Sequence, residues 1–115
     1  LLECRSNQLT ALPATLPTTL EYLDCNRNEL AQLPDTLPES LTHLGCARNR
    51  LTALPETLPA TIVSLECRQN ELTHLPETLP ASLEYLDCRF NQLKTLPAFL
   101  DTIDHLYCDD ELPRV

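Results

Sequence analysis

The sequence of 115 residues contains a single glycine, Gly45, which excludes the glycine-rich loops that cradle phosphate groups in many proteins. It is also poor in cations, because eight Lys and Arg stand against 17 Asp and Glu and give a formal net charge of −9. Binding to a nucleic-acid backbone needs clustered cations that displace counterions, so nucleic acid is not an expected partner. No apolar run approaches the ~18 residues that a membrane span requires.

Close cysteine pairs are missing as well, although the chain has six cysteines. Structural zinc sites use pairs such as C-x2-C, and secreted disulfide scaffolds use uneven spacings. Here the cysteines recur every 21 residues, and only the last interval is 20. We interpret them as one structural packing position, with no metal, and expect six free, buried thiols in a reducing compartment. They are Cys4, Cys25, Cys46, Cys67, Cys88 and Cys108.

The interval of 21 residues is the period of an internal repeat. One unit begins at Leu20 and reads L-x-x-L-x-C-x-x-N-x-L-x-x-L-P-x-x-L-P-x-x, and the next begins at Leu41. A unit of this size is too small to fold alone, so stability must come from stacking. We expect one domain over residues 1–115, with about five units and an irregular sixth that is one residue shorter between Leu100 and Ile103.

The first half of each unit alternates apolar and polar residues, as in Leu23, Asp24, Cys25 and Asn26. This period of two predicts a short strand with one buried face, on which the cysteines lie. An asparagine follows each of the first five cysteines by three residues, where the chain leaves the strand and exposes backbone groups. A buried amide can both donate to and accept from those groups. We expect a stacked structural series of Asn7, Asn28, Asn49, Asn70 and Asn91.

The second half of each unit contains two Leu-Pro steps, such as Leu33-Pro34 and Leu37-Pro38. Proline lacks an amide donor and biases the residue before it toward extended geometry. These steps predict extended, polyproline-like segments without substantial helix, whose leucines reach the core. The predicted fold is a right-handed repeat solenoid with about six short parallel strands on its concave face.

The repeat pattern, which runs from Leu2 to about Leu106, resembles the leucine-rich repeats of bacterial effectors that type III secretion delivers into host cells. The doubled Leu-Pro, as in residues 75–80, is typical of that class. The resemblance implies a virulence protein that binds a host protein in the host cytoplasm. In some members the repeats recruit substrates for an attached E3 ubiquitin ligase domain, which here would lie beyond Val115. Because solenoids need capped ends and neither end of this chain has a cap, we expect a fragment of a longer protein.

The ligase domain of that family carries a nucleophilic cysteine in a C-x-D motif, and Cys108-Asp109-Asp110 matches it. Cys108 is also the sixth member of the cysteine series, and a buried cysteine without neighbouring cations cannot stabilise a thiolate. We therefore assign no catalytic residue and interpret the chain itself as a non-enzyme. No cofactor and no small-molecule substrate are expected.

Stacked parallel strands curve a solenoid, so the outward strand positions and the turns after them form the candidate binding face. All three tyrosines, one of the two phenylalanines and five of the eight cations fall there. Aromatic residues and arginine are the types enriched at interface hot spots. We predict a protein-binding surface made of Tyr22, Asp24, Arg27, His43, Arg48, Glu66, Arg68, Tyr85, Asp87, Arg89, Phe90 and His105.

Other interpretations of these residues stay open. The acids and arginines of this face are also explained by exposed ion pairs that serve solubility and register. His43 and His105 lie three units apart, or ~14 Å, which is too far for one metal. Glycoside hydrolysis by Asp24 and Glu66, ~9.6 Å apart, lacks a surrounding cleft in the sequence pattern. The remaining alternatives are a substrate-recruiting part of a ligase and a structural or adhesive repeat array.

Overall fold

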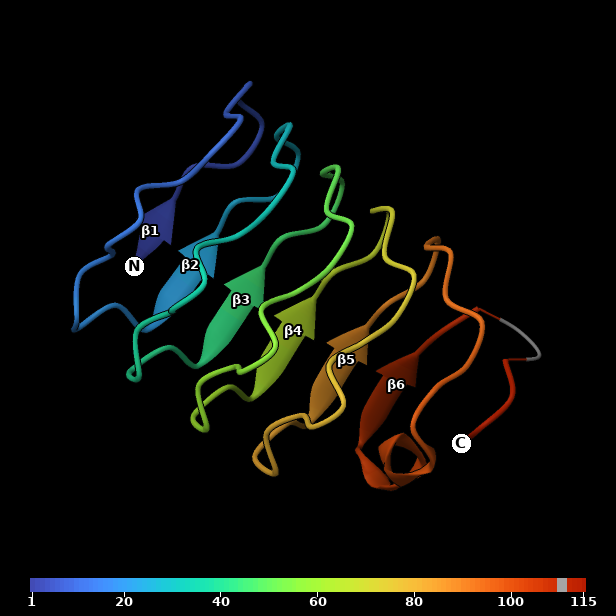
Figure 1. Cartoon of the computed structure of the whole chain (residues 1–115). Helices are drawn as coiled ribbons and strands as arrows, with labels where there is room; N and C mark the ends of the chain where they lie inside the picture. The colour runs from blue at the N-terminus through green and yellow to red at the C-terminus, as the bar shows by residue number, and fades with distance from the viewer. Residues whose placement is uncertain (110–111) are drawn as a thin grey trace.

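The structure is a computed structural model that describes residues 1–109 and 112–115. Its main feature is one sheet of parallel strands that follow one another in chain order. Figure 1 shows them side by side, from the N-terminal strand at one end of the molecule to the C-terminal strand at the other. The six strands are β1 (Leu2–Glu3), β2 (Tyr22–Asp24), β3 (His43–Gly45), β4 (Ser64–Glu66), β5 (Tyr85–Asp87) and β6 (His105–Tyr107).

Each strand pairs with the next without any shift in register. Leu23 lies opposite Leu44, Leu44 opposite Leu65 and Leu65 opposite Leu86. The last pair keeps this register although its repeat is shorter, with Leu86 opposite Leu106. Because side chains alternate along a strand, this alignment collects every inward residue in one column and every outward residue in another. The predicted parallel-strand solenoid is confirmed.

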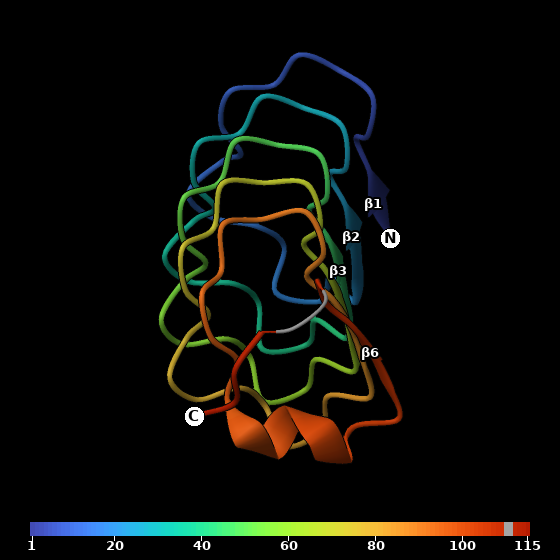
Figure 2. The same cartoon turned by 90° about the vertical axis from the view of Figure 1, so that its right-hand side faces the viewer.

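The segments that connect the strands lie on the other side of the molecule from the sheet. They pass in front of the strands in Figure 1 and stand opposite them in Figure 2. One short 3-10 helix, η1 (Ala98–Thr102), occurs in the shortened repeat. Asp101 stands there in place of the second proline, which frees Leu100 from the extended geometry that a following proline favours. The prediction of a repeat solenoid without substantial helix is therefore confirmed.

Helix content also bears on membrane insertion. In residues 1–109 and 112–115, no helix has the length and hydrophobicity of a segment that crosses a membrane.

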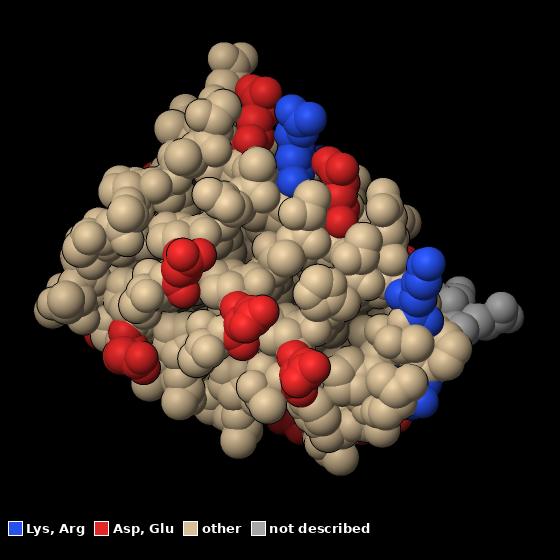
Figure 3. Space-filling view, viewed as in Figure 1, with Lys and Arg blue, Asp and Glu red and all other residues tan. Residues whose placement is uncertain are grey.

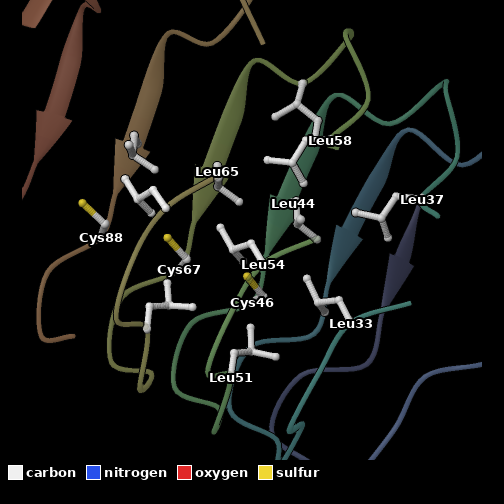
Figure 4. Packing of buried hydrophobic residues seen from close by; sticks show 14 of the residues in the cluster. Leu33, Leu37, Leu44, Cys46, Leu51, Leu54, Leu58, Leu65, Cys67 and Cys88 are labelled. Atoms are coloured by element: carbon white, nitrogen blue, oxygen red, sulfur yellow. The ribbon is translucent and has the colours of Figure 1, made fainter. Parts of the chain in front are cut away.

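A single apolar cluster fills the space between the sheet and the return segments. Figure 4 shows leucines of the return segments, among them Leu33 and Leu54, gathered with strand residues such as Leu44. Fully burying one such side chain contributes about 1.5–3 kcal/mol relative to leaving it exposed. The core therefore extends through the whole stack, and each repeat is stabilised by its neighbours.

The inner cysteines form a continuous row in this core, as Figure 4 shows for Cys46 and Cys67. Three of these thiols, those of Cys25, Cys46 and Cys88, donate to a carbonyl of the next strand, and Cys25 Sγ lies 3.2 Å from the Gly45 carbonyl oxygen. Burial raises the pKa of Cys25 to about 12, because a thiolate would lose its hydration there. The buried free thiols are Cys25, Cys46, Cys67 and Cys88.

The two outer thiols differ from the prediction. All six cysteines are free, but Cys4 and Cys108 are only half-buried. They belong to the first and last strand turns, where a neighbouring repeat covers them from one side only. The prediction of six buried thiols is wrong for these two.

The asparagines tie each turn to the one before it. The Nδ2 amide of Asn49 donates to the carbonyls of Cys46 and Cys25, both at 3.1 Å, and its Oδ1 accepts the N–H of Leu30 at 3.0 Å. Asn7 is exposed, and its amide bonds stay within its own turn. The three hydrogen bonds of Asn49, which join two turns, recur at Asn28, Asn70 and Asn91.

Candidate protein-binding face

The outward side chains of β1 to β6 and of the turns after them form a surface that we call the strand face. Its first cluster is an aromatic pair at the start of β2 and β3. The rings of Tyr22 and His43 stack with centroids 5.5 Å apart and an angle of 25° between their planes. The hydroxyl of Thr42 bonds to Nδ1 of His43 (2.8 Å) and helps to fix that ring. Tyr22 remains 41% exposed, so the pair presents an apolar surface to a partner.

A second aromatic cluster lies over β5 and β6. The Tyr85 ring packs at 5.5 Å from Tyr107 and at 6.3 Å from His105, in tilted arrangements. The guanidinium of Arg89 lies 5.2 Å from the centre of the Tyr107 ring, a cation–π contact. Ser64 occupies the strand position between the two clusters, opposite both His43 and Tyr85. The aromatic surface is therefore divided into two parts by a small polar residue.

The acidic column beside these rings is largely covered. Asp87 is 1% exposed, and both its oxygens accept hydrogen bonds from Arg89, at 3.0 and 2.9 Å. These bonds raise the pKa of Arg89, because ionised Asp87 stabilises its charge. Asp24 is also buried and lies 3.9 Å from a guanidinium nitrogen of Arg5. Asp24 and Asp87, two of the predicted binding residues, are therefore buried, because arginines of the same and neighbouring repeats lie over them.

Three other arginines of the face, Arg27, Arg48 and Arg68, are not held by hydrogen bonds to a carboxylate of the described residues. Arg68 lies 3.8 Å from Asp87, and its Nε is buried without a hydrogen-bond partner in the described part of the chain. Arg27 and Arg48 are exposed and form no ion pair with any carboxylate in residues 1–109 and 112–115. The middle of the face therefore carries positive charge that the described residues do not neutralise.

These arginines surround a hollow of about 530 Å³. At its edge, the absence of a side chain at Gly45 leaves room for the Asn26 amide, which would lie only 3.1 Å from an added Cβ. Asn26 Oδ1 then accepts the N–H of Ala47 at 2.7 Å. The hollow is lined by Arg5, Ser6, Tyr22, Asp24, Asn26, Arg27, Ala47, Arg48, Glu66 and Arg68.

The family model described as Leucine Rich Repeat matches residues 82–103. The solved leucine-rich-repeat domain of a Shigella effector superposes with a TM-score of 0.85 at 35% identity, covering 91% of this chain. The chain is a leucine-rich-repeat protein. The predicted resemblance to the repeat domains of bacterial effectors is therefore confirmed.

Two YopM structures extend this comparison. YopM from Yersinia enterocolitica WA-314 is 41% identical over 82% of this leucine-rich-repeat chain, with a TM-score of 0.77. YopM from Yersinia pestis, described as a leucine-rich effector protein, is 32% identical over 94%, with a TM-score of 0.83. The chain spans 46%, 20% and 30% of the lengths of the Shigella and the two Yersinia structures, respectively. A comparison with curated protein sequences gave no match.

The leucine-rich-repeat fold brings most of the predicted site residues together, in the two aromatic clusters, the Asp87 ion pairs and the hollow. Phe90 stands apart as an exposed ring, and its N–H donates to the carboxylate of Asp109 at 3.0 Å. His43 and His105 belong to different clusters. In the described residues, no group of three or more His, Cys, Asp or Glu side chains is placed to hold a metal ion.

Sequence reasoning missed Arg5, Ser6, Asn26 and Ala47 in the hollow and Tyr107 in the second cluster. These residues occupy the same repeat positions as the predicted ones, so the register did contain the information. The register did not show which of these outward residues would line one hollow.

Cys108 has a different environment from the predicted one. Its Sγ lies 4.0 Å from Nη2 of Arg114, which reaches it because the C-terminal segment pairs with Leu96. A single arginine therefore neighbours this cysteine. Arg114 is also paired with Asp101 at 3.0 Å, and that bond raises the pKa of Arg114. Asp110, the third residue of the C-x-D match, lies outside the described residues.

The return side offers a contrast to the strand face. Figure 3 views the molecule from that side and shows scattered acidic residues, with some basic residues near the edges, on a mostly uncharged surface. A hollow of about 560 Å³ is present there beside η1, with Phe99, Leu79 and Ile103 in its lining. It has an exposed aromatic residue but no arginine in its lining.

Proposed function

We propose that this leucine-rich-repeat domain binds a host protein through its strand face, as the recognition part of a bacterial effector. The observation that carries the proposal is the division of that face into two aromatic clusters with an arginine-lined hollow beside them. Aromatic and arginine side chains are the residue types that dominate protein–protein hot spots. The likeness to repeat domains of Shigella and Yersinia effectors supports the placement in a host cell.

The same face would serve substrate recruitment in a longer effector. A domain that binds a protein without changing it can deliver that protein to any catalytic domain attached to it. The proposal for this chain is limited to the binding step.

Site-specific photo-cross-linking tests the proposed face. A benzophenone amino acid is placed at Tyr22 or Tyr85 on the strand face, or at Phe99 on the return side as the control. The variants are irradiated in host-cell extract, and the adducts are identified by mass spectrometry. We expect the same host protein to be cross-linked from both strand-face positions and not from position 99.

A matched pair of variants checks that the contacts carry affinity. Tyr22→Ser with Tyr85→Ser should weaken capture of the cross-linked protein at least tenfold, with an unchanged circular dichroism spectrum. Phe99→Ser should leave capture unchanged. Equal capture by the double variant and the parent chain would sink the assignment of the strand face.

A further inference from the structure

One residue in each of five turns has a backbone conformation that its side chain disfavours. Residues with a Cβ seldom adopt positive φ, whereas glycine adopts it freely and asparagine often does. None of the five positive-φ positions holds glycine or asparagine, and the only glycine of the chain lies in β3 instead. The five residues, which we call the turn row, are Ser6 (φ 59°), Arg27 (58°), Arg48 (56°), Gln69 (53°) and Phe90 (60°).

The strained conformation is held by the repeat itself. The N–H of Arg27 donates to the Ala47 carbonyl and that of Arg48 to the Arg68 carbonyl, both at 2.9 Å. The next residue in each of these two turns is a buried asparagine of the ladder. The side chains of the turn row are consequently left outside, and all five are exposed. Strain that persists at exposed positions indicates that the side chains themselves are needed, since they contribute nothing to the core.

The charge of the turn row is concentrated on Arg27 and Arg48. These two side chains stand in adjacent repeats, ~4.8 Å apart at the backbone, so both guanidinium groups can reach one anionic group or two neighbouring ones. They line the hollow together with Asp24 and Glu66, whose carboxylates come from the strands. An incoming anion is therefore expected at the arginine rim and not against the strands.

Phe90 completes the row at its other end. Its ring is 63% exposed, the highest exposed fraction among the aromatic residues of the strand face. It stands two repeats beyond Arg48, ~9.6 Å along the stack. An extended peptide covers that distance in about three residues. One strand-like segment can therefore contact the arginines and the phenylalanine at once.

We propose that the turn row binds an extended acidic segment of the partner protein, with its carboxylates on Arg27 and Arg48 and an apolar side chain on Phe90. This inference rests on the proposed function, because it names the chemistry of the segment that the strand face recognises. A phosphorylated segment would present the same anionic chemistry to the two guanidinium groups.

Peptide binding tests the proposal directly on the purified chain. The probe is a fluorescein-labelled peptide with two glutamates separated by one residue and a leucine four residues after the second, so that all three side chains lie on one face of an extended peptide. Fluorescence anisotropy gives its Kd against the parent chain, against Arg27→Gln with Arg48→Gln, and against Arg50→Gln with Lys94→Gln. The last variant also removes two positive charges, but from residues outside the lining of the hollow, so it controls for the change in net charge.

We expect the parent chain and the control variant to bind the peptide equally and the turn-row variant to bind at least tenfold more weakly. The glutamine analogue of the peptide should show the same loss on the parent chain. Equal weakening by the two double variants, equal binding of the glutamine analogue, or no binding of the glutamate peptide to the parent chain would overturn the proposal. A phosphoserine analogue then separates the sources: tighter binding assigns phosphate as the preferred anion, and equal or weaker binding assigns carboxylate.

The cross-linking experiment keeps the two proposals apart. If Tyr22 and Tyr85 capture a host protein and the turn-row variant captures it equally well, the turn row fails while the proposed function stands. If neither tyrosine position captures a protein, the proposed function itself fails.

Discussion

Asp87 and Arg89 are joined by two hydrogen bonds across a nearly fully buried carboxylate, with Nε–Oδ1 at 3.0 Å and Nη2–Oδ2 at 2.9 Å. This pair also sets the second aromatic cluster, because the same guanidinium lies over the Tyr107 ring. The carboxylate thus orients a side chain that the strand face displays.

Asp87→Asn should destabilise the fold and disorder this cluster. The asparagine amide is neutral, and its NH2 group cannot accept a hydrogen bond from Arg89 as a carboxylate oxygen does. A buried polar group left without a partner costs about 1–3 kcal/mol. Urea unfolding measures the loss. Glu84→Gln is the control, since Glu84 is exposed one residue before β5. Equal midpoints for the two variants would contradict the anchoring role of Asp87.

Asn49→Ala should be far more damaging than Asn7→Ala. Removing the Asn49 amide takes one of two amide donors from the carbonyls of Cys25 and Cys46, and it leaves the N–H of Leu30 without its side-chain partner. Three lost bonds of ~1 kcal/mol each give an expected decrease of about 3 kcal/mol in the free energy of unfolding. Asn7 is exposed and bonds within its own turn, so its loss should cost less than about 1 kcal/mol. Similar midpoints for the two variants would argue against a ladder that links turns.

The thiols should make the fold sensitive to alkaline pH. Burial raises the pKa of Cys25 and of Cys88 from 9.0 to about 12. In the folded state these thiols stay protonated above pH 9.0, whereas the unfolded chain releases their protons, so unfolding is favoured as pH rises. Their contribution is complete below pH 9.0 and is lost toward pH 12. Urea midpoints between pH 8 and 11 should fall, and Cys25→Ala should fall less steeply with pH.

The same burial predicts unequal thiol reactivity. With a thiol reagent at pH 8, the half-buried Cys4 and Cys108 should react first, and the four inner cysteines should react only after unfolding. Peptide mapping of the labelled protein identifies the order. Early labelling of Cys46 or Cys67 would contradict the buried row.

Arg48→Asn should raise stability while the turn row loses affinity for an acidic peptide. The positive φ of 56° at Arg48 costs about 1–2 kcal/mol for a residue with an ordinary side chain, and asparagine relieves part of it. We expect a gain of up to about 1 kcal/mol in urea unfolding. Arg50→Asn, at a position outside the positive-φ set, should give no gain. A loss of stability at position 48 would mean that the arginine side chain supports the fold.

The periodic part of the structure could be predicted because the residues at one repeat position, such as that of Leu44, have the same kinds of neighbours in every repeat. Its place in the period therefore fixes both its face and its burial. The interval also predicted the in-register strands. η1 was not predicted, since it arises where Asp101 replaces a proline and the repeat is short by one residue.

The strand face was harder to predict than the core. Alternation shows which way Asp87 points but not that arginines cover it. The hollow is lined by Asn26 and Ala47, which a hydrogen bond joins across neighbouring repeats, and the position of each residue in its own repeat does not show that contact. The position of a residue in the repeat predicts which way its side chain points. The shape of the face and the pairing of its charges depend on which residues occupy those positions.

The asparagine series has a consequence for how the chain opens. Each inner amide holds backbone atoms of two turns, so an inner turn cannot detach without breaking bonds of its neighbour. Unfolding is therefore cooperative along the stack and starts at the outer turns, where Asn7 holds only its own turn. Amide hydrogens of β3 and β4 should exchange last. The arginine-lined hollow, whose lining includes Ala47 and Glu66, is thus built on the most persistent part of the solenoid.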